Sequence, residues 1–106
     1  DKALAIDSNN AFVYMIKGIG DYTRPSFAGG SKENGNKNLS TALELIDKHD
    51  NSAGDKKFIS AIANFHLANI AFITKNKQQA LQYLTNSLRV APDYKRALEL
   101  SKKIES

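Results

Sequence analysis

Large apolar residues recur at spacings of three and four along almost the whole chain, and this spacing leaves few folds open. It places apolar side chains on one face of an α-helix, whereas a half-buried strand needs strict alternation of apolar and polar residues. No stretch of the sequence alternates Val, Ile or Thr with polar residues. The sequence therefore predicts an all-α fold.

Turn-forming residues divide this helical pattern into segments. We predict a single domain over residues 1–106. Its parts are the end of a preceding helix at 1–8, a helix pair at 11–49 with an inserted loop at 23–31, a second helix pair at 55–92 and a terminal capping helix at 93–105. Because the chain opens inside a predicted helix, we expect a fragment of a longer repeat protein or a chain whose leader has been removed.

Residues that satisfy open backbone groups mark the predicted helix ends. Ser31 can accept a hydrogen bond from the first turn of the helix that follows it, and Asp55 is the predicted cap of the next helix. Asn76 suits the left-handed backbone of a tight turn. Pro92 ends the following helix, because proline lacks the amide hydrogen that would continue it.

The composition limits the classes of function. A chain of 106 residues, 42% of them hydrophobic, can build one modest core. The absence of cysteine excludes disulfides, thiolate zinc sites and thiol nucleophiles. No apolar run approaches the roughly 20 residues that span a bilayer, so we expect no membrane span. The 15 Lys and Arg residues are interleaved with 11 Asp and Glu, which leaves nucleic-acid binding only a remote alternative.

Internal repetition indicates a known architecture. Residues 61–94 span one period of about 34 residues, the length of a tetratricopeptide repeat. Within this period Leu67 and Ala68 are a large and a small apolar residue, Ala80 is a small residue in the second helix, and Pro92 is a helix stop. These positions resemble the tetratricopeptide repeat (TPR) family. The resemblance implies an α-α superhelix of antiparallel helix pairs.

The joint inside the first helix pair carries a more specific resemblance. Pro25 stands there, followed after three residues by Gly29 and Gly30. This Pro-x-x-x-Gly-Gly joint is similar to that of a group of exported bacterial TPR proteins. The resemblance implies an exported or periplasmic protein.

In TPR proteins the first helix of each pair lines a concave face that holds a peptide or another protein. The resemblance assigns that face to apolar and aromatic residues and one amide, namely Phe12, Met15, Ile19, Tyr22, Ile62, Phe65, Asn69 and Phe72. We expect a groove for an apolar or extended segment, with Asn69 bonding to the ligand backbone. The alternative is that a third helix pair, the inserted loop or a sister chain covers these residues as core.

We predict no catalytic residue, metal site or cofactor. His66 has no carboxylate and no second His at three or four residues' distance, so it is predicted to be a hydrogen-bonded structural imidazole. His49 lies with Asp47 and Asp50 at a helix end, where compensation of the helix charge explains the cluster. Phe27 stands in the middle of the inserted loop. We expect it to fold back over the core, with presentation to a partner as the alternative.

We therefore expect a non-enzymatic scaffold that binds a protein or peptide on the concave face of a TPR-like superhelix. In one alternative, the same apolar face joins a sister subunit, so that the chain is a homo-oligomer or an accessory piece of a larger assembly. Nucleic-acid binding is the remote alternative.

Overall fold

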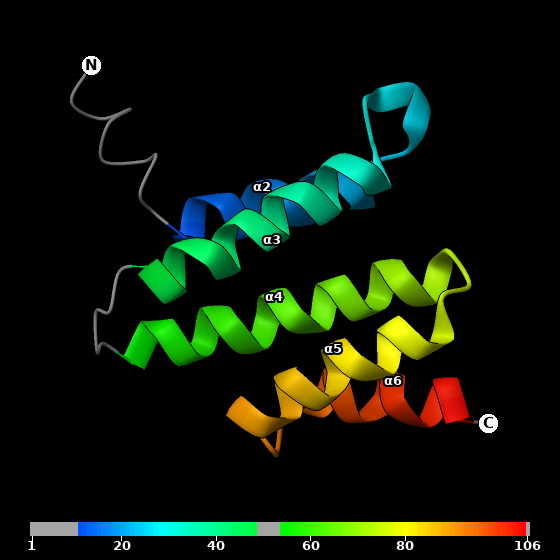
Figure 1. Ribbon diagram of the computed structural model, residues 1–106. Coiled ribbons are helices and arrows are strands. Elements are labelled where there is room, and N and C mark those ends of the chain that lie inside the picture. The colour runs from blue at the N-terminus through cyan, green and yellow to red at the C-terminus, as the bar shows by residue number, and fades with distance from the viewer. Residues whose placement is uncertain (1–10, 49–53, 106) are drawn as a thin grey trace. The chain divides into compact units, whose positions relative to one another are not determined.

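The computed structural model describes residues 11–48 and 54–105, and every regular element within these residues is helical. In chain order the elements are α2 (Ala11–Thr23), the short 3-10 helix η1 (Ser26–Ala28), α3 (Lys32–Lys48), α4 (Gly54–Ile73), α5 (Lys77–Val90) and α6 (Lys95–Glu105), labelled as in Figure 1. The all-α prediction is confirmed. The predicted helix end at residues 1–8 lies outside the described residues.

The chain divides into two compact units, residues 1–52 and 53–106. In the first unit α2 packs against α3, and in the second α4 packs against α5 while α6 contacts both (Figure 1). Each pair is antiparallel, because a short connection joins the end of its first helix to the start of its second. The antiparallel helix pairs are thus confirmed, whereas a single domain over the whole chain stays a prediction.

The helices α2 and α3 approach closely at two glycines. A Cβ atom on Gly18 would lie 2.8 Å from Cγ of Leu39, and a Cβ atom on Gly35 would lie 2.8 Å from Cβ of Tyr22. Both distances are too short for van der Waals contact between carbon atoms, so side chains at these positions would force the helices apart. The absence of two side chains therefore sets how closely this pair packs.

The start of α3 agrees with its predicted cap. The backbone N–H of Asn34 donates a hydrogen bond of 3.1 Å to Oγ of Ser31, the residue before the helix. Further along α3, the apolar side chains of Leu39, Ala42 and Ile46 are buried. Capping and burial together explain why this segment is a helix.

The prediction that Phe27 folds back over the core is wrong. Its side chain is 92% exposed, on the short helix η1 inside the loop. The loop turns sharply on its own backbone, since the N–H groups of both Ala28 and Gly30 donate to the carbonyl oxygen of Pro25. A loop that closes on itself so tightly leaves its middle residue at the tip, away from the helix pair.

The turn between α4 and α5 is a Schellman motif. Its two hydrogen bonds run from the N–H of Asn76 to the carbonyl of Ala71 and from the N–H of Lys75 to the carbonyl of Phe72. The left-handed residue is Lys75, with φ 64°, and this corrects the prediction that Asn76 has that conformation. Asn76 instead caps α5, because its side chain accepts a hydrogen bond from the N–H of Gln79.

Small residues are fully buried in the pair formed by α4 and α5. Ala68 on α4 and Ala80 on α5 are fully buried. Ser87, also fully buried, donates from Oγ to the carbonyl oxygen of Ala61 over 2.8 Å, so it links the two helices as well as fitting between them. The interior of the second pair thus contains two alanines and a serine hydroxyl. In the first pair, glycines lie at the helix contact instead.

The third helix of the second unit completes its core. Buried residues from α4, α5 and α6 form one cluster, made up of Phe65, Ala68, Ala71, Ala80, Leu84, Ala97, Leu100 and Ile104. Ala97, Leu100 and Ile104 of α6 belong to this cluster, and the lysines of the helix are exposed. The helix thus packs against both α4 and α5, while its role as a terminal capping helix stays a prediction.

Two predicted helix starts are displaced. The helix α4 begins at Gly54, so Asp55 lies inside the helix and does not precede it as a cap. The helix α6 begins at Lys95, after a turn in which the N–H of Tyr94 donates to the carbonyl of Ala91. That turn holds the residues following Pro92 outside the helix and delays its start.

Candidate functional site

The helix α2 carries a row of large apolar side chains that remain partly open to solvent. Phe12 is 46% exposed and Ile16 is 51% exposed. Ile19, one turn further on, is half-buried. Spacings of four and three place these residues on one face of the helix. We call Phe12, Ile16 and Ile19 the α2 strip.

Met15 and Tyr22, which were predicted to line the same binding face, lie elsewhere. Both are buried, together with Gly18, and the three residues share a face at spacings of three and four. The contact of Tyr22 with Gly35 shows that this face is turned toward α3. Of the predicted partner-binding residues in the first unit, Phe12 and Ile19 are therefore accessible, while Met15 and Tyr22 belong to the interior.

The helix α4 carries a similar row. Phe58 is 60% exposed and Ile73 is 47% exposed. Ile62 and Asn69, between them, are half-buried. The spacings of four, seven and four again define one helix face. We call Phe58, Ile62, Asn69 and Ile73 the α4 strip.

Phe65 lies beside the α4 strip but is covered by α6. Its ring centroid is 5.6 Å from that of Tyr94, and the guanidinium carbon of Arg96 lies 4.8 Å from its centroid. A cation at this distance over an aromatic face is attracted to it. Phe65 is only 5% exposed, and Phe72, half-buried, packs against the same cluster. A third helical element thus covers Phe65, which is the core role that the alternative interpretation assigns to it.

His66 is a buried imidazole next to this aromatic group. Its ring meets that of Phe65 edge to face, with centroids 4.9 Å apart. Burial, and then the positive charge of Arg96, lower the pKa of His66 from 6.5 to about 4. The imidazole is therefore neutral at neutral pH. His49, whose cluster was assigned to a helix end, lies outside the described residues, as does Asp50.

The described residues offer no cluster of side chains for a metal ion. Within them, no three His, Asp or Glu side chains gather closely enough to hold a metal ion. The helices among these residues also fall short of the length and hydrophobicity that crossing a membrane requires. What the two strips can provide is apolar contact area on rigid helices.

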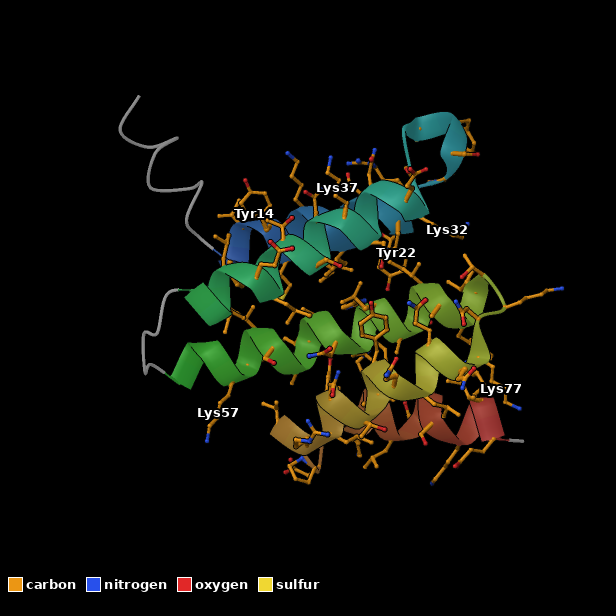
Figure 2. The ribbon with its side chains drawn as sticks, in the orientation of Figure 1. Tyr14, Tyr22, Lys32, Lys37, Lys57 and Lys77 are labelled. Carbon is orange, nitrogen blue, oxygen red and sulfur yellow. The ribbon has the colours of Figure 1, made fainter. Side chains whose placement is uncertain are left out.

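Two lysines of the second unit lie far from each other. Lys57 lies near the start of α4 and Lys77 at the start of α5, so they stand at opposite ends of this antiparallel pair (Figure 2). A nucleic-acid site would require positive side chains gathered along one face. Lys57 and Lys77 do not lie together on one face of this pair.

Some of the accessible apolar residues were missing from the sequence prediction. Ile16 and Phe58 are the most exposed members of the two strips, yet neither was assigned to the binding face. The signal was present in the spacing, because Ile16 is four residues after Phe12 and Phe58 is four residues before Ile62.

Comparisons with protein-family models, with curated proteins and with solved structures found no match to this chain.

Proposed function

We propose that this protein is a TPR-like, non-enzymatic scaffold that binds a protein or peptide through the apolar strips of its first helices. The observation that carries the proposal is that α2 and α4 each leave large apolar side chains open although each is packed against its own second helix. Phe12, Ile16 and Phe58 are 46%, 51% and 60% exposed. Exposed apolar patches are typical of interaction sites.

The strips are preformed, and this lowers the cost of binding. The closeness of Gly18 and Gly35 holds α2 on α3, and the hydrogen bond of Ser87 to Ala61 holds α4 on α5. A ligand that meets such a surface orders few protein side chains on binding. The ligand that fits is a segment with apolar side chains spaced along it, and Asn69 in the α4 strip is an amide suited to its backbone.

A peptide-display library tests this proposal directly. The wild-type chain should enrich sequences rich in apolar and aromatic residues. The double variants Phe12→Ser/Ile16→Ser and Phe58→Ser/Ile73→Ser should lose that enrichment while keeping the wild-type helical circular dichroism. Leu98→Ser is the matched control, because Leu98 is a 39% exposed apolar residue on α6, outside both strips.

Two results would contradict the proposal. If the enriched sequences bind both double variants as tightly as the wild type, the strips are not the binding site. If sedimentation shows a dimer that resists dilution and both double variants are monomeric, the strips join two copies of the chain, and the self-association alternative replaces peptide binding.

A further inference from the structure

The sequence contains one asparagine that is followed directly by glycine, the pair Asn34 and Gly35. Both residues lie in the first turn of α3, where Asn34 is exposed and Gly35 is buried. Glycine has no Cβ atom, so its backbone nitrogen is less hindered than that of any other residue type. The side-chain amide of Asn34 and the nitrogen of Gly35 are therefore suited to react with each other.

The reaction between these two groups needs only water. The backbone nitrogen of Gly35 attacks Cγ of Asn34 and a five-membered ring closes, while the side-chain nitrogen leaves as ammonia with the proton that the backbone nitrogen gives up. Water then opens the ring at one of its two carbonyl carbons. Opening at the side-chain carbonyl gives aspartate. Opening at the main-chain carbonyl gives isoaspartate, in which the main chain runs through Cβ and Cγ.

Two features of α3 keep these groups from reacting. The N–H of Gly35 donates a hydrogen bond of 3.0 Å to the carbonyl oxygen of Ser31. The helical ψ of about −42° also turns the Gly35 nitrogen away from the side chain of Asn34, whereas the flat ring needs the two groups side by side. The ring can therefore close only after the first turn of α3 opens, and helix ends open more readily than helix centres.

Ser31 controls this opening. Its Oγ accepts a hydrogen bond of 3.1 Å from the N–H of Asn34, and its own N–H donates to the carbonyl oxygen of Asp21 on α2 over 2.6 Å. A cap of this kind stabilises the end of a helix. One serine thus holds the reactive turn closed and joins it to the neighbouring helix.

Gly35 lies at the close contact between α3 and α2. A Cβ atom on Gly35 would lie 2.8 Å from Cβ of Tyr22 and 2.9 Å from the carbonyl oxygen of Gly18, both on α2 (Figure 2 labels Tyr22). Isoaspartate at position 34 lengthens the main chain by one atom directly before this contact. The helix cannot then start at Ser31 and still bring Gly35 to its place against α2.

We propose that Asn34 and Gly35 form a self-modification site, at which opening of the first turn of α3 leads to isoaspartate and prevents the α2–α3 pair from closing again as before. The closed pair protects the site, and the modified residue records that the pair has opened. This inference uses no residue of the α2 or α4 strip, so it does not rest on the proposed function.

Mass spectrometry of peptides from the full chain tests the proposal. The chain is kept in mildly alkaline buffer, with and without concentrated urea, and the mass change of deamidation at Asn34 is followed over time. Asn34 should react more slowly without urea, because the rate follows the population of the open turn. Ser31→Ala removes the cap, and it should raise the rate in buffer about 5-fold while leaving the rate in urea unchanged.

Two controls accompany this measurement. Thr41→Ala is the matched variant, because the hydroxyl of Thr41 donates to the carbonyl of Lys37 further along α3, and it should leave the rate unchanged. Asn36 is exposed on the same helix but is followed by lysine, so it should keep its mass. The proposal is overturned if Asn34 keeps its mass in buffer in both the wild type and Ser31→Ala, if urea does not change its rate, or if Ser31→Ala reacts no faster than Thr41→Ala.

The stability of the product tests the second part of the proposal. Chains that carry isoaspartate are identified with a methyltransferase that recognises this residue, and they should unfold at a lower urea concentration than unmodified chains. Asn34→Asp carries the same charge on an ordinary main chain, and it should not be destabilised, since a carboxylate near a helix N-terminus is favourable. Equal unfolding of the isoaspartyl chain and Asn34→Asp would mean that Gly35 returns to its contact, and this would overturn the proposal.

Discussion

The two units pack their helix pairs by different means. In the first, α2 meets α3 at Gly18 and Gly35, where no side chain separates the backbones. In the second, α4 meets α5 through Ala68, Ala80 and the hydroxyl of Ser87, and α6 adds a third layer. Small residues are common to both pairs, but among the described helices only the second pair has a third helix packed against it.

This difference shows that the same apolar pattern has two outcomes. Phe65 and Phe12 are both aromatic residues on first helices, yet Phe65 is 5% exposed and Phe12 is 46% exposed. Phe65 is covered by Arg96 of α6 and by Tyr94, the residue before that helix. Accessibility is thus decided by the neighbouring element and not by the residue type.

The largest effect should come from the three-helix core of the second unit. Leu84 is 2% exposed within the cluster shared by α4, α5 and α6. Leu84→Ala should lower the free energy of unfolding by about 3 kcal/mol, because the cavity loses both transfer and packing energy. Urea unfolding followed by circular dichroism measures this. Leu98→Ala is the control, and an equal loss in the two variants would show that this core is not tightly packed.

A smaller loss of stability should follow when a side chain is added at the glycine contact of the first unit. A Cβ atom on Gly35 would lie 2.9 Å from the carbonyl oxygen of Gly18, so Gly35→Ala should cost about 2 kcal/mol. Gly20→Ala is the matched control on α2, since nothing lies within 4 Å of its added Cβ atom. That control should be stabilised by up to about 1 kcal/mol, as alanine favours helices. Stabilisation by both substitutions would contradict the close approach.

The stability of the second unit should depend on pH, with an effect of similar size. The pKa of His66 is lowered from 6.5 to about 4, first by burial and then by the charge of Arg96. As the pH falls from 6.5 toward 4, the unfolded chain binds a proton that the folded chain does not. The free energy of unfolding should therefore fall by about 2 kcal/mol across this window, with solvent screening allowed for.

The His66→Leu variant separates the contribution of His66 to the pH dependence of stability from the contribution of the carboxylates. Its stability should change less between pH 6.5 and 4 than that of the wild type, while both titrate the same acidic groups. Unfolding in urea at a series of pH values gives the two curves. Parallel curves would mean that His66 is not held neutral by its surroundings.

The smallest expected effects come from the two residues with positive φ, Lys75 and Gly29. Lys75 has φ 64° without being glycine, so Lys75→Gly should stabilise the chain by about 1 kcal/mol. Gly29 has φ 88° and open space around it, so Gly29→Ala should destabilise by about 1 kcal/mol through backbone conformation alone. Thermal unfolding measures both changes. Shifts in the same direction would contradict the assigned backbone conformations.

Much of the fold could be predicted from the sequence. The spacing of apolar residues located all five described helices, and Ser31 has the predicted role of a cap. These features depend on residues close in sequence or on helix periodicity. The predictions were wrong at the helix starts and at Asn76. At these places the gain or loss of a single hydrogen bond moves the end of a helix.

The candidate site was predicted less well. The prediction placed Met15 and Phe65 on an open face beside Phe12, but both are buried. Helical spacing identifies which residues share a face and does not identify what packs on that face. The exposure of Phe27 was missed for a related reason, since the hydrogen bonds to Pro25 and Asp21 that hold it outward join residues whose pairing appears only in the folded loop.

The amino-acid sequence by itself determined the helices, their order and the small residues at which they meet, because periodicity and chain connectivity are local properties. Only the tertiary structure decided which apolar residues are covered. Burial depends on a second element arriving at a given face, as α6 does over Phe65, and on a loop closing on its own backbone, as happens around Phe27. Among the described residues, those arrangements leave Phe12, Ile16, Phe27 and Phe58 open to solvent.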